Sequence, residues 1–102
     1  MDISKRYMTA GIAREIEPII QLMLWKLLDD KIKANASLDY LQVFTLSTFY
    51  VSGQTVFKII HRQEVPPAHD EWYFTGLGLF INTTIWVIDS GESATMLFPH
   101  EY

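Results

Sequence analysis

The chain has 102 residues, the usual length of one domain, and it has no cysteine, which excludes disulfides, thiolate nucleophiles and cysteine-based zinc sites. The net charge is −4, and the 8 lysine and arginine residues never form a run, which disfavours nucleic-acid binding. Hydrophobic residues make up 49% of the chain and aromatic residues 14%, so the sequence predicts a packed core rather than disorder.

Neither a leader nor a membrane span is predicted. The first residues, Met1–Arg6, lack the long apolar region of a signal peptide. The longest apolar run of the predicted helix, Leu22–Trp25, is far too short to cross a bilayer. We therefore expect a cytoplasmic protein that makes no contact with a membrane.

A helix is predicted after a short first strand. Residues 4–12 should form that strand at a sheet edge, with Gly11 ending it. The helix should run from Pro18 to Ala34, because proline suits the first helical position and Asn35 suits the C-terminal cap. Trp25, at the flank of the apolar face, is expected at the rim of the core. That face is formed by residues in steps of three and four: Ile16, Ile20, Met23, Leu24, Leu27, Leu28 and Ile32.

The stretch Leu38–Val65 is predicted to form a long β-hairpin. β-Branched and aromatic residues dominate both arms, and Ser52-Gly53 supplies the turn. Side chains alternate between the two faces of a strand, so one face of the second arm should meet the helix and the other should be solvated. The inward set is Phe57, Ile59, His61 and Gln63, and the outward set is Val56, Lys58, Ile60, Arg62 and Glu64.

Three further strands complete the predicted fold. Glu71–Thr75 should form one of them, and Thr83–Ile88 and Ser93–Phe98 should pair around a turn at residues 89–92. The sequence predicts one helix and about five or six strands, and helices and strands do not alternate along the chain. This pattern predicts an α+β fold with one amphipathic helix packed on one face of an antiparallel sheet. No linker or repeat divides the chain, so residues 1–102 are predicted to be a single domain.

No catalytic, cofactor or metal signature is present, so we predict a protein that is not an enzyme. His61 with Glu64 or Asp89 is the arrangement that would suit a small enzyme, but alternation places His61 and Glu64 on opposite strand faces. His61, His69 and His100 are too far apart in the sequence to match known metal-ligand spacings. The sequence therefore predicts no cofactor and no metal.

Binding to another protein is the function class that remains. The apolar segment 72–81 must either fold over the core or meet a partner. The outward-facing charged side chains of the second hairpin arm are also available to bind a partner. The candidate partner-binding residues are Arg62, Glu64, Trp72, Phe74, Leu79 and Phe80.

Six groups of residues form recognisable motifs: Arg6-Tyr7 with Gly11, Gln21 with Trp25, Asp39–Phe44, His61–Pro66, Ile85–Asp89 and Thr95–Tyr102. Together these motifs resemble the small family called "domain of unknown function 960", found in Gram-positive bacteria, their phages and plasmids. Two features depart from the family pattern: Ala94 and His100 replace commoner polar and acidic residues, and Val51 and the 76–82 region are longer or more apolar. If those loops bind, the partner differs from that of the relatives.

The resemblance implies a mobile-element setting, in which compact acidic proteins often block host machinery. The leading hypothesis is a non-enzymatic interaction protein of phage or mobile-element type, for instance an anti-CRISPR-like inhibitor of a host defence or regulatory protein. One alternative is the small enzyme that uses His61. The other is a self-associating structural module, in which an exposed strand edge pairs with a second copy.

Overall fold

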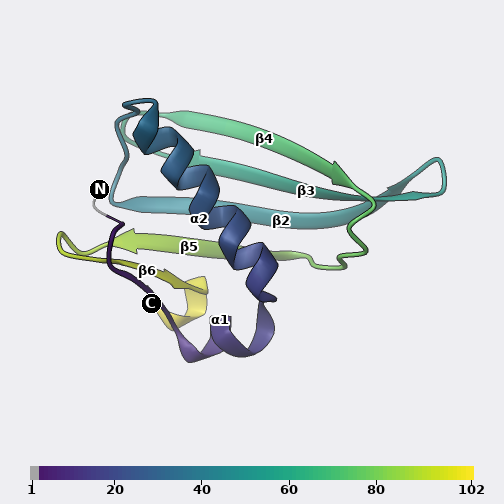
Figure 1. Ribbon diagram of the computed structural model, residues 1–102, viewed down its shortest axis with the longest axis horizontal. Coiled ribbons are helices and arrows are strands. Elements are labelled where there is room, and N and C mark those ends of the chain that lie inside the picture. Colours follow the sequence, from purple (N-terminus) through teal and green to yellow (C-terminus); the bar gives the residue numbers. More distant parts are fainter. Residues whose placement is uncertain (1–2) are drawn as a thin grey trace.

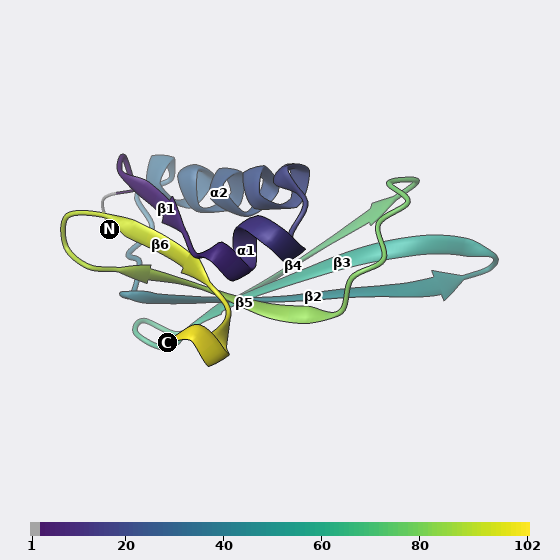
Figure 2. The ribbon, with the colours of Figure 1, turned by 90° about the horizontal axis from the view of Figure 1, so that it is seen from below.

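Six strands form one sheet in the order β1-β6-β5-β2-β3-β4, and the helices lie on one face of it (Figures 1 and 2). The computed structural model describes residues 3–102. Among these residues, no helix combines the length and apolar character needed to cross a bilayer. The elements are β1 (Arg6–Met8), α1 (Ala10–Glu15), α2 (Pro18–Lys33), β2 (Leu41–Val51), β3 (Gln54–Gln63), β4 (Ala68–Thr75), β5 (Thr83–Asp89), β6 (Ala94–Leu97) and the 3₁₀ helix η1 (Pro99–Glu101).

The sheet is mixed, which corrects the predicted purely antiparallel arrangement. Five strands are joined by antiparallel pairs, whereas β1 runs parallel to β6, with Arg6 opposite Ala94 and Met8 opposite Met96. The fold is therefore a mostly antiparallel six-stranded sheet with one main helix, α2. We call the sheet face that α2 covers the inner face, and the opposite face the outer face.

The segment predicted as a first strand contains a helix as well. β1 ends at Met8, and α1 starts at Ala10, with the Thr9 hydroxyl accepting a hydrogen bond from the backbone N–H of Ile12 at 3.3 Å. Gly11 therefore lies inside α1 and does not end a strand. Ile12 is fully buried, so α1 adds an apolar side chain to the core.

Helix α2 matches its prediction closely, and Asn35 ends it. Asn35 has a positive φ of 60°, and the backbone N–H groups of Asn35 and Ala36 donate to the carbonyls of Ile32 and Lys31. Trp25 is buried rather than at the rim, and the Arg6 guanidinium lies 5.1 Å from the centre of its ring.

Replacing Asn35 by alanine is expected to lower the free energy of unfolding by about 1 kcal/mol, because a Cβ destabilises the left-handed conformation and alanine lacks the compensating side-chain amide. Thermal or urea denaturation measures the change. Asn35→Gly is the matched control, since glycine adopts a positive φ freely. A glycine variant as unstable as the alanine variant would contradict this explanation.

The β2–β3 hairpin lies between β5 and β4 in the sheet and extends beyond it at one end (Figure 1). Ser52 and Gly53 form its tight turn with positive φ values of 49° and 79°, the conformation that two-residue hairpin turns favour. The predicted inward positions along β3 are confirmed, since Phe57, Ile59 and His61 are buried beneath α2, but Val56, predicted on the solvated face, is buried as well. The second arm ends at Gln63, two residues earlier than predicted.

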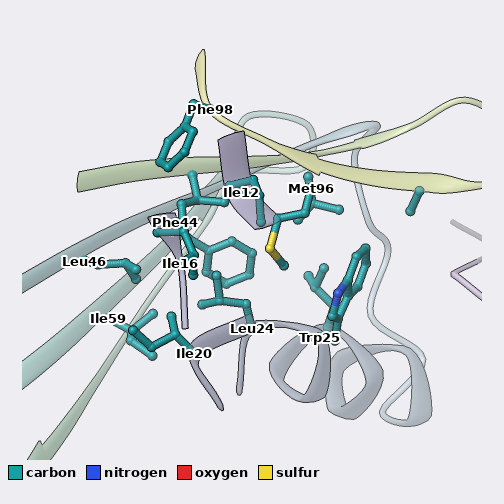
Figure 3. Packing of buried hydrophobic residues seen from close by; sticks show 14 of the residues in the cluster. Ile12, Ile16, Ile20, Leu24, Trp25, Phe44, Leu46, Ile59, Met96 and Phe98 are labelled. Carbon is teal, nitrogen blue, oxygen red and sulfur yellow. The ribbon is translucent and has the colours of Figure 1, made fainter. Parts of the chain in front are cut away.

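The hydrophobic core lies between α2 and the inner face. Figure 3 shows Phe44 between the strands and Leu24 of α2, with Ile59 and Met96 on either side. Each of these four side chains is completely buried. Burial of each such side chain stabilises the fold by roughly 1.5–3 kcal/mol before the entropy of ordering is counted.

Glu101 joins the two ends of the described chain. Its Oε1 accepts hydrogen bonds from the Thr9 hydroxyl at 2.6 Å and from the Phe98 backbone N–H at 2.9 Å. The hydrogen bond from Thr9 is the main reason that the pKa of Glu101 is lower than usual. A Cβ on Gly11 would lie 2.6 Å from the other Glu101 oxygen, so glycine leaves room for this carboxylate.

Candidate functional site

His61 lies at the centre of a buried polar network on the inner face. Its Nε2–H donates to the side-chain oxygen of Gln42, whose amide nitrogen donates in turn to the Gln63 side chain at 2.9 Å and to the Asp39 carbonyl at 2.8 Å. The Gln63 amide donates to the carbonyls of Ser37 and Pro66, both at 2.9 Å. The network therefore joins β2, β3 and both flanking loops.

The other ring nitrogen of His61 is left without a hydrogen bond. Within residues 3–102, Nδ1 is buried and has no hydrogen-bond partner. The Asp70 carboxylate lies 4.0 Å from Nδ1 and accepts a hydrogen bond from Lys31. Burial, with a further contribution from Lys31, lowers the pKa of His61 to about 4, and Asp70 opposes this shift only weakly. The imidazole is therefore neutral at pH 7.

This geometry argues against His61 as a catalytic base. His61 has no exposed surface, so a substrate cannot reach its ring nitrogens. The carboxylate beside it belongs to Asp70, whereas Glu64 lies in the turn after the end of β3. Within the described part of the chain, no three His, Asp or Glu side chains are grouped closely enough to hold a metal ion. The His61 network is best explained as support for the core.

A groove on the outer face contains Arg62 and Glu64. Its volume is about 570 Å³, and the β3–β4 turn forms one wall. Neither Arg62 nor Glu64 makes a side-chain hydrogen bond or ion pair with any other residue in the range 3–102. Lys58, the other cation on this part of the face, is paired with Glu71 at 2.9 Å. The groove is lined by Asp39, Tyr40, Leu41, Val43, Arg62, Gln63, Glu64, Pro67, Ala68 and His69.

A second exposed surface, the hairpin tip cluster, lies at the far end of the β2–β3 hairpin. Tyr50 and Phe80 are each 68% exposed, and their ring centres are 6.3 Å apart. The residues from Thr45 to Phe57 and from Trp72 to Ile88 include no charged side chain. The cluster consists of Phe49, Tyr50, Val51, Leu77 and Phe80, all of them exposed.

Hydrogen bonds hold the 76–82 loop against β2. The Thr48 hydroxyl donates to the carbonyls of Leu79 and Ile81 at 3.1 and 3.2 Å, and it accepts from the backbone N–H of Ile81 at 3.0 Å. The Asn82 side chain accepts from the Thr48 backbone N–H at 3.2 Å. Leu79 is buried in the core, so the loop is anchored on both sides of Phe80.

The candidate partner-binding residues divide between the core and the surface. Trp72 and Phe74 are half-buried and pack against the core from β4, and Leu79 is only 8% exposed. Phe80 lies in the hairpin tip cluster, and Arg62 and Glu64 line the groove. The candidates did not include Phe49, Tyr50, Val51 and Leu77 of the hairpin tip cluster. The absence of charged residues from 45–57 and 72–88 is the sequence signal that could have indicated them.

Comparisons with known proteins show the family but no function. The crystal structure of a protein of unknown function from Enterococcus faecalis matches with a TM-score of 0.74, at 21% identity over 96% of this chain and 90% of that chain. At this identity, the likeness shows the fold alone. No curated protein matches. The resemblance expected from the motifs is confirmed by a match over residues 5–101, and the chain belongs to the family described as staphylococcal protein of unknown function, DUF960.

Proposed function

We propose that this chain is a small non-enzymatic protein-interaction domain that binds a partner protein through the hairpin tip cluster. The observation that carries the proposal is the exposure of Tyr50 and Phe80 in a part of the sheet without charged residues. Interface centres are enriched in aromatic residues and depleted of charged ones. The surface recognised on the partner should therefore be apolar, uncharged and concave, because the tip protrudes.

The anchored loop favours binding as well. Because Thr48 and Asn82 already hold the 76–82 segment in place, little conformational freedom remains to be lost when a partner docks on Phe80. Exposed aromatic side chains on a rigid support are typical of residues that dominate binding energy. An inhibitor of a host defence or regulatory protein, such as an anti-CRISPR-like protein, is the narrower form of this proposal.

Replacing Phe80 by aspartate is expected to weaken the complex by roughly 30-fold or more, because it removes a central aromatic contact and places a charge in an apolar interface. Affinity capture from a lysate of the producing cell, followed by mass spectrometry, identifies the protein retained by the wild-type chain. Calorimetry with the purified partner then gives the dissociation constants of both forms.

The matched control is Leu22→Asp, which places the same charge at an exposed apolar position of α2 that lies outside the cluster. It should retain the partner with unchanged affinity. Circular dichroism should show that both variants are folded. A partner retained equally by the wild type and by Phe80→Asp would remove the hairpin tip from the site.

A further inference from the structure

Strand β4 forms one edge of the sheet and has a free row of backbone groups. It has 8 residues, whereas β1 at the other edge has 3. Within residues 3–102, β3 is the only strand that pairs with β4. Natural proteins shorten, charge or cover a sheet edge, because its unpaired N–H and C=O groups bind other strands. Since β4 is long and pairs on one side only, a further strand can join the sheet there.

The hydrogen-bond pattern shows which residues of β4 present these groups. The Asp89 N–H donates to the Tyr40 carbonyl at 2.8 Å, so these two residues form a hydrogen-bonded pair between β5 and β2. Such pairs alternate along an antiparallel ladder, so the even-numbered residues of β2 bond to β5 and the odd-numbered ones to β3. The register then makes the even-numbered residues of β4 bond to β3. The backbone groups that point away from the sheet therefore belong to His69, Glu71, Tyr73 and Thr75.

We infer that a second copy of this chain adds its own β4 to this edge, forming an antiparallel two-fold dimer with one continuous sheet. The axis is perpendicular to the sheet and passes between the two Trp72 residues. Tyr73 then lies opposite Glu71 of the second copy, and Thr75 lies opposite His69 of that copy. Four outward-facing residues on each copy make four hydrogen-bonded pairs, with two hydrogen bonds in each pair.

The charges on β4 favour this register over its neighbours. An axis at Asp70 or at Glu71 would place that residue opposite its own copy, so like charges would meet. An axis at Tyr73 would leave His69 beyond the end of the partner strand. The axis at Trp72 uses every outward-facing group and places no like charges opposite each other.

Ion pairs within the chain prepare this edge for an uncharged contact. The Asp70 carboxylate accepts a hydrogen bond from Lys31, and Glu71 is paired with Lys58 at 2.9 Å. Neither carboxylate needs a cation from a partner, so a basic peptide has no advantage over a second copy.

The position of α2 favours a second copy in particular. The last turn of α2 lies above the start of β4, where Lys31 bonds to Asp70, whereas the end of β4 lies clear of α2 (Figures 1 and 2). Trp72 and Phe74 are therefore only half-buried on the inner face. In the dimer, Phe74 of the second copy lies opposite Asp70, beside the last turn of α2. Each copy thus helps to cover the side chain that the other leaves exposed.

The short contact predicts a weak dimer. A strand of 8 residues is about 27 Å long and a sheet is about 10 Å thick, so each copy buries on the order of 300 Å². Stable interfaces bury about 800 Å² per partner, and smaller ones are typical of transient complexes. We therefore expect a dissociation constant of roughly 100 μM and a monomer at about 1 μM.

Proline at position 73 tests the strand pairing. The Tyr73 N–H points outward, so Tyr73→Pro keeps every hydrogen bond to β3 but removes one donor per copy from the dimer. Sedimentation equilibrium between about 1 μM and 1 mM should show a dissociation constant raised by about tenfold or more. Tyr73→Ala loses the same side chain but keeps the N–H, and it should stay within about threefold of the wild type. A wild-type monomer at about 1 mM overturns the inference, as does a folded Tyr73→Pro variant that dimerises as tightly as the wild type.

Single cysteines test the register without a proline, since the chain has no cysteine of its own. Trp72→Cys places two thiols across the axis, where the Cα atoms lie about 4.5 Å apart, within the range of a disulfide. Tyr73→Cys places the two Cα atoms roughly 9 Å apart, which is too far. Under mild oxidation, non-reducing electrophoresis should show Trp72→Cys linking at least about tenfold faster, with circular dichroism confirming both folds. Equal rates, or faster linkage of Tyr73→Cys, overturn the inference.

Phe80→Asp separates this dimer from contacts of the hairpin tip cluster. The inference concerns a different surface and is independent of the proposed function, so this variant should leave the dissociation constant unchanged. A dimer that Phe80→Asp dissociates uses the tip and overturns the inference.

Discussion

Replacing Phe44 by alanine is expected to lower the free energy of unfolding by about 3–5 kcal/mol. Phe44 is fully buried between α2 and the sheet (Figure 3). Its ring centre lies 5.0 Å from that of His61. Removing the ring loses its burial and leaves a cavity among side chains that strands and a helix hold in place. Because domains of this size are stable by only about 5–15 kcal/mol, the variant should be close to its unfolding limit.

Urea denaturation followed by circular dichroism measures this loss. The midpoint should fall while the slope with denaturant stays unchanged, since the surface exposed on unfolding is nearly the same. Phe80→Ala is the matched control, because it removes the same ring from a largely exposed site and should change stability by less than about 0.5 kcal/mol. Equal losses for the two variants would contradict the position of Phe44 at the core centre.

Acidification from pH 7 to pH 4 is expected to remove about 3 kcal/mol of stability through His61 alone. The pKa of His61 is lowered to about 4 in the folded protein, chiefly by burial, whereas the unfolded chain has the usual value near 6.5. The unfolded chain therefore binds a proton first as the pH falls. The stabilisation is complete above pH 6.5 and decreases through the window down to pH 4, by at most about 1.4 kcal/mol per pH unit.

Urea denaturation at intervals from pH 7 to pH 4.5 measures this slope. The pKa values of Asp70, Glu71 and Glu101 are all lowered, so the stability linked to these carboxylates is lost mainly at lower pH. His61→Gln keeps a polar side chain but cannot titrate, and its stability should change much less in this window. A slope as steep in the variant as in the wild type would show that another group is responsible.

Local sequence patterns predicted the features that depend on interactions between residues close in sequence. The period of two along β3 placed His61 and Gln63 correctly inside, because a strand with one buried face leaves no alternative register. Pro18 and Asn35 marked the ends of α2 for the same kind of local reason. Ser52-Gly53 marked the hairpin turn, since its two positive φ angles need residues of this type.

Features that depend on distant partners were not predictable in this way. The parallel pairing of Tyr7 with Thr95 joins segments from opposite ends of the chain and leaves no periodic signal in either. Lys31 and Asp70 meet beside His61 only after the helix packs on the sheet. In the apolar loop, nothing local distinguished buried Leu79 from exposed Phe80, because no regular alternation exists there.

The parallel β1–β6 pair sets an order of events for a newly made chain. The β2–β3–β4 meander and α2 are close in sequence and can form while synthesis continues. β1 precedes these elements in the chain, yet its hydrogen-bonding partner β6 follows them all, and Thr9 bonds to Glu101, which follows β6. The segment from Arg6 to Thr9 must therefore wait until residues 94–101 have been made. A chain halted before residue 94 would leave β1 without its strand partner, and α1 without its contacts to β6.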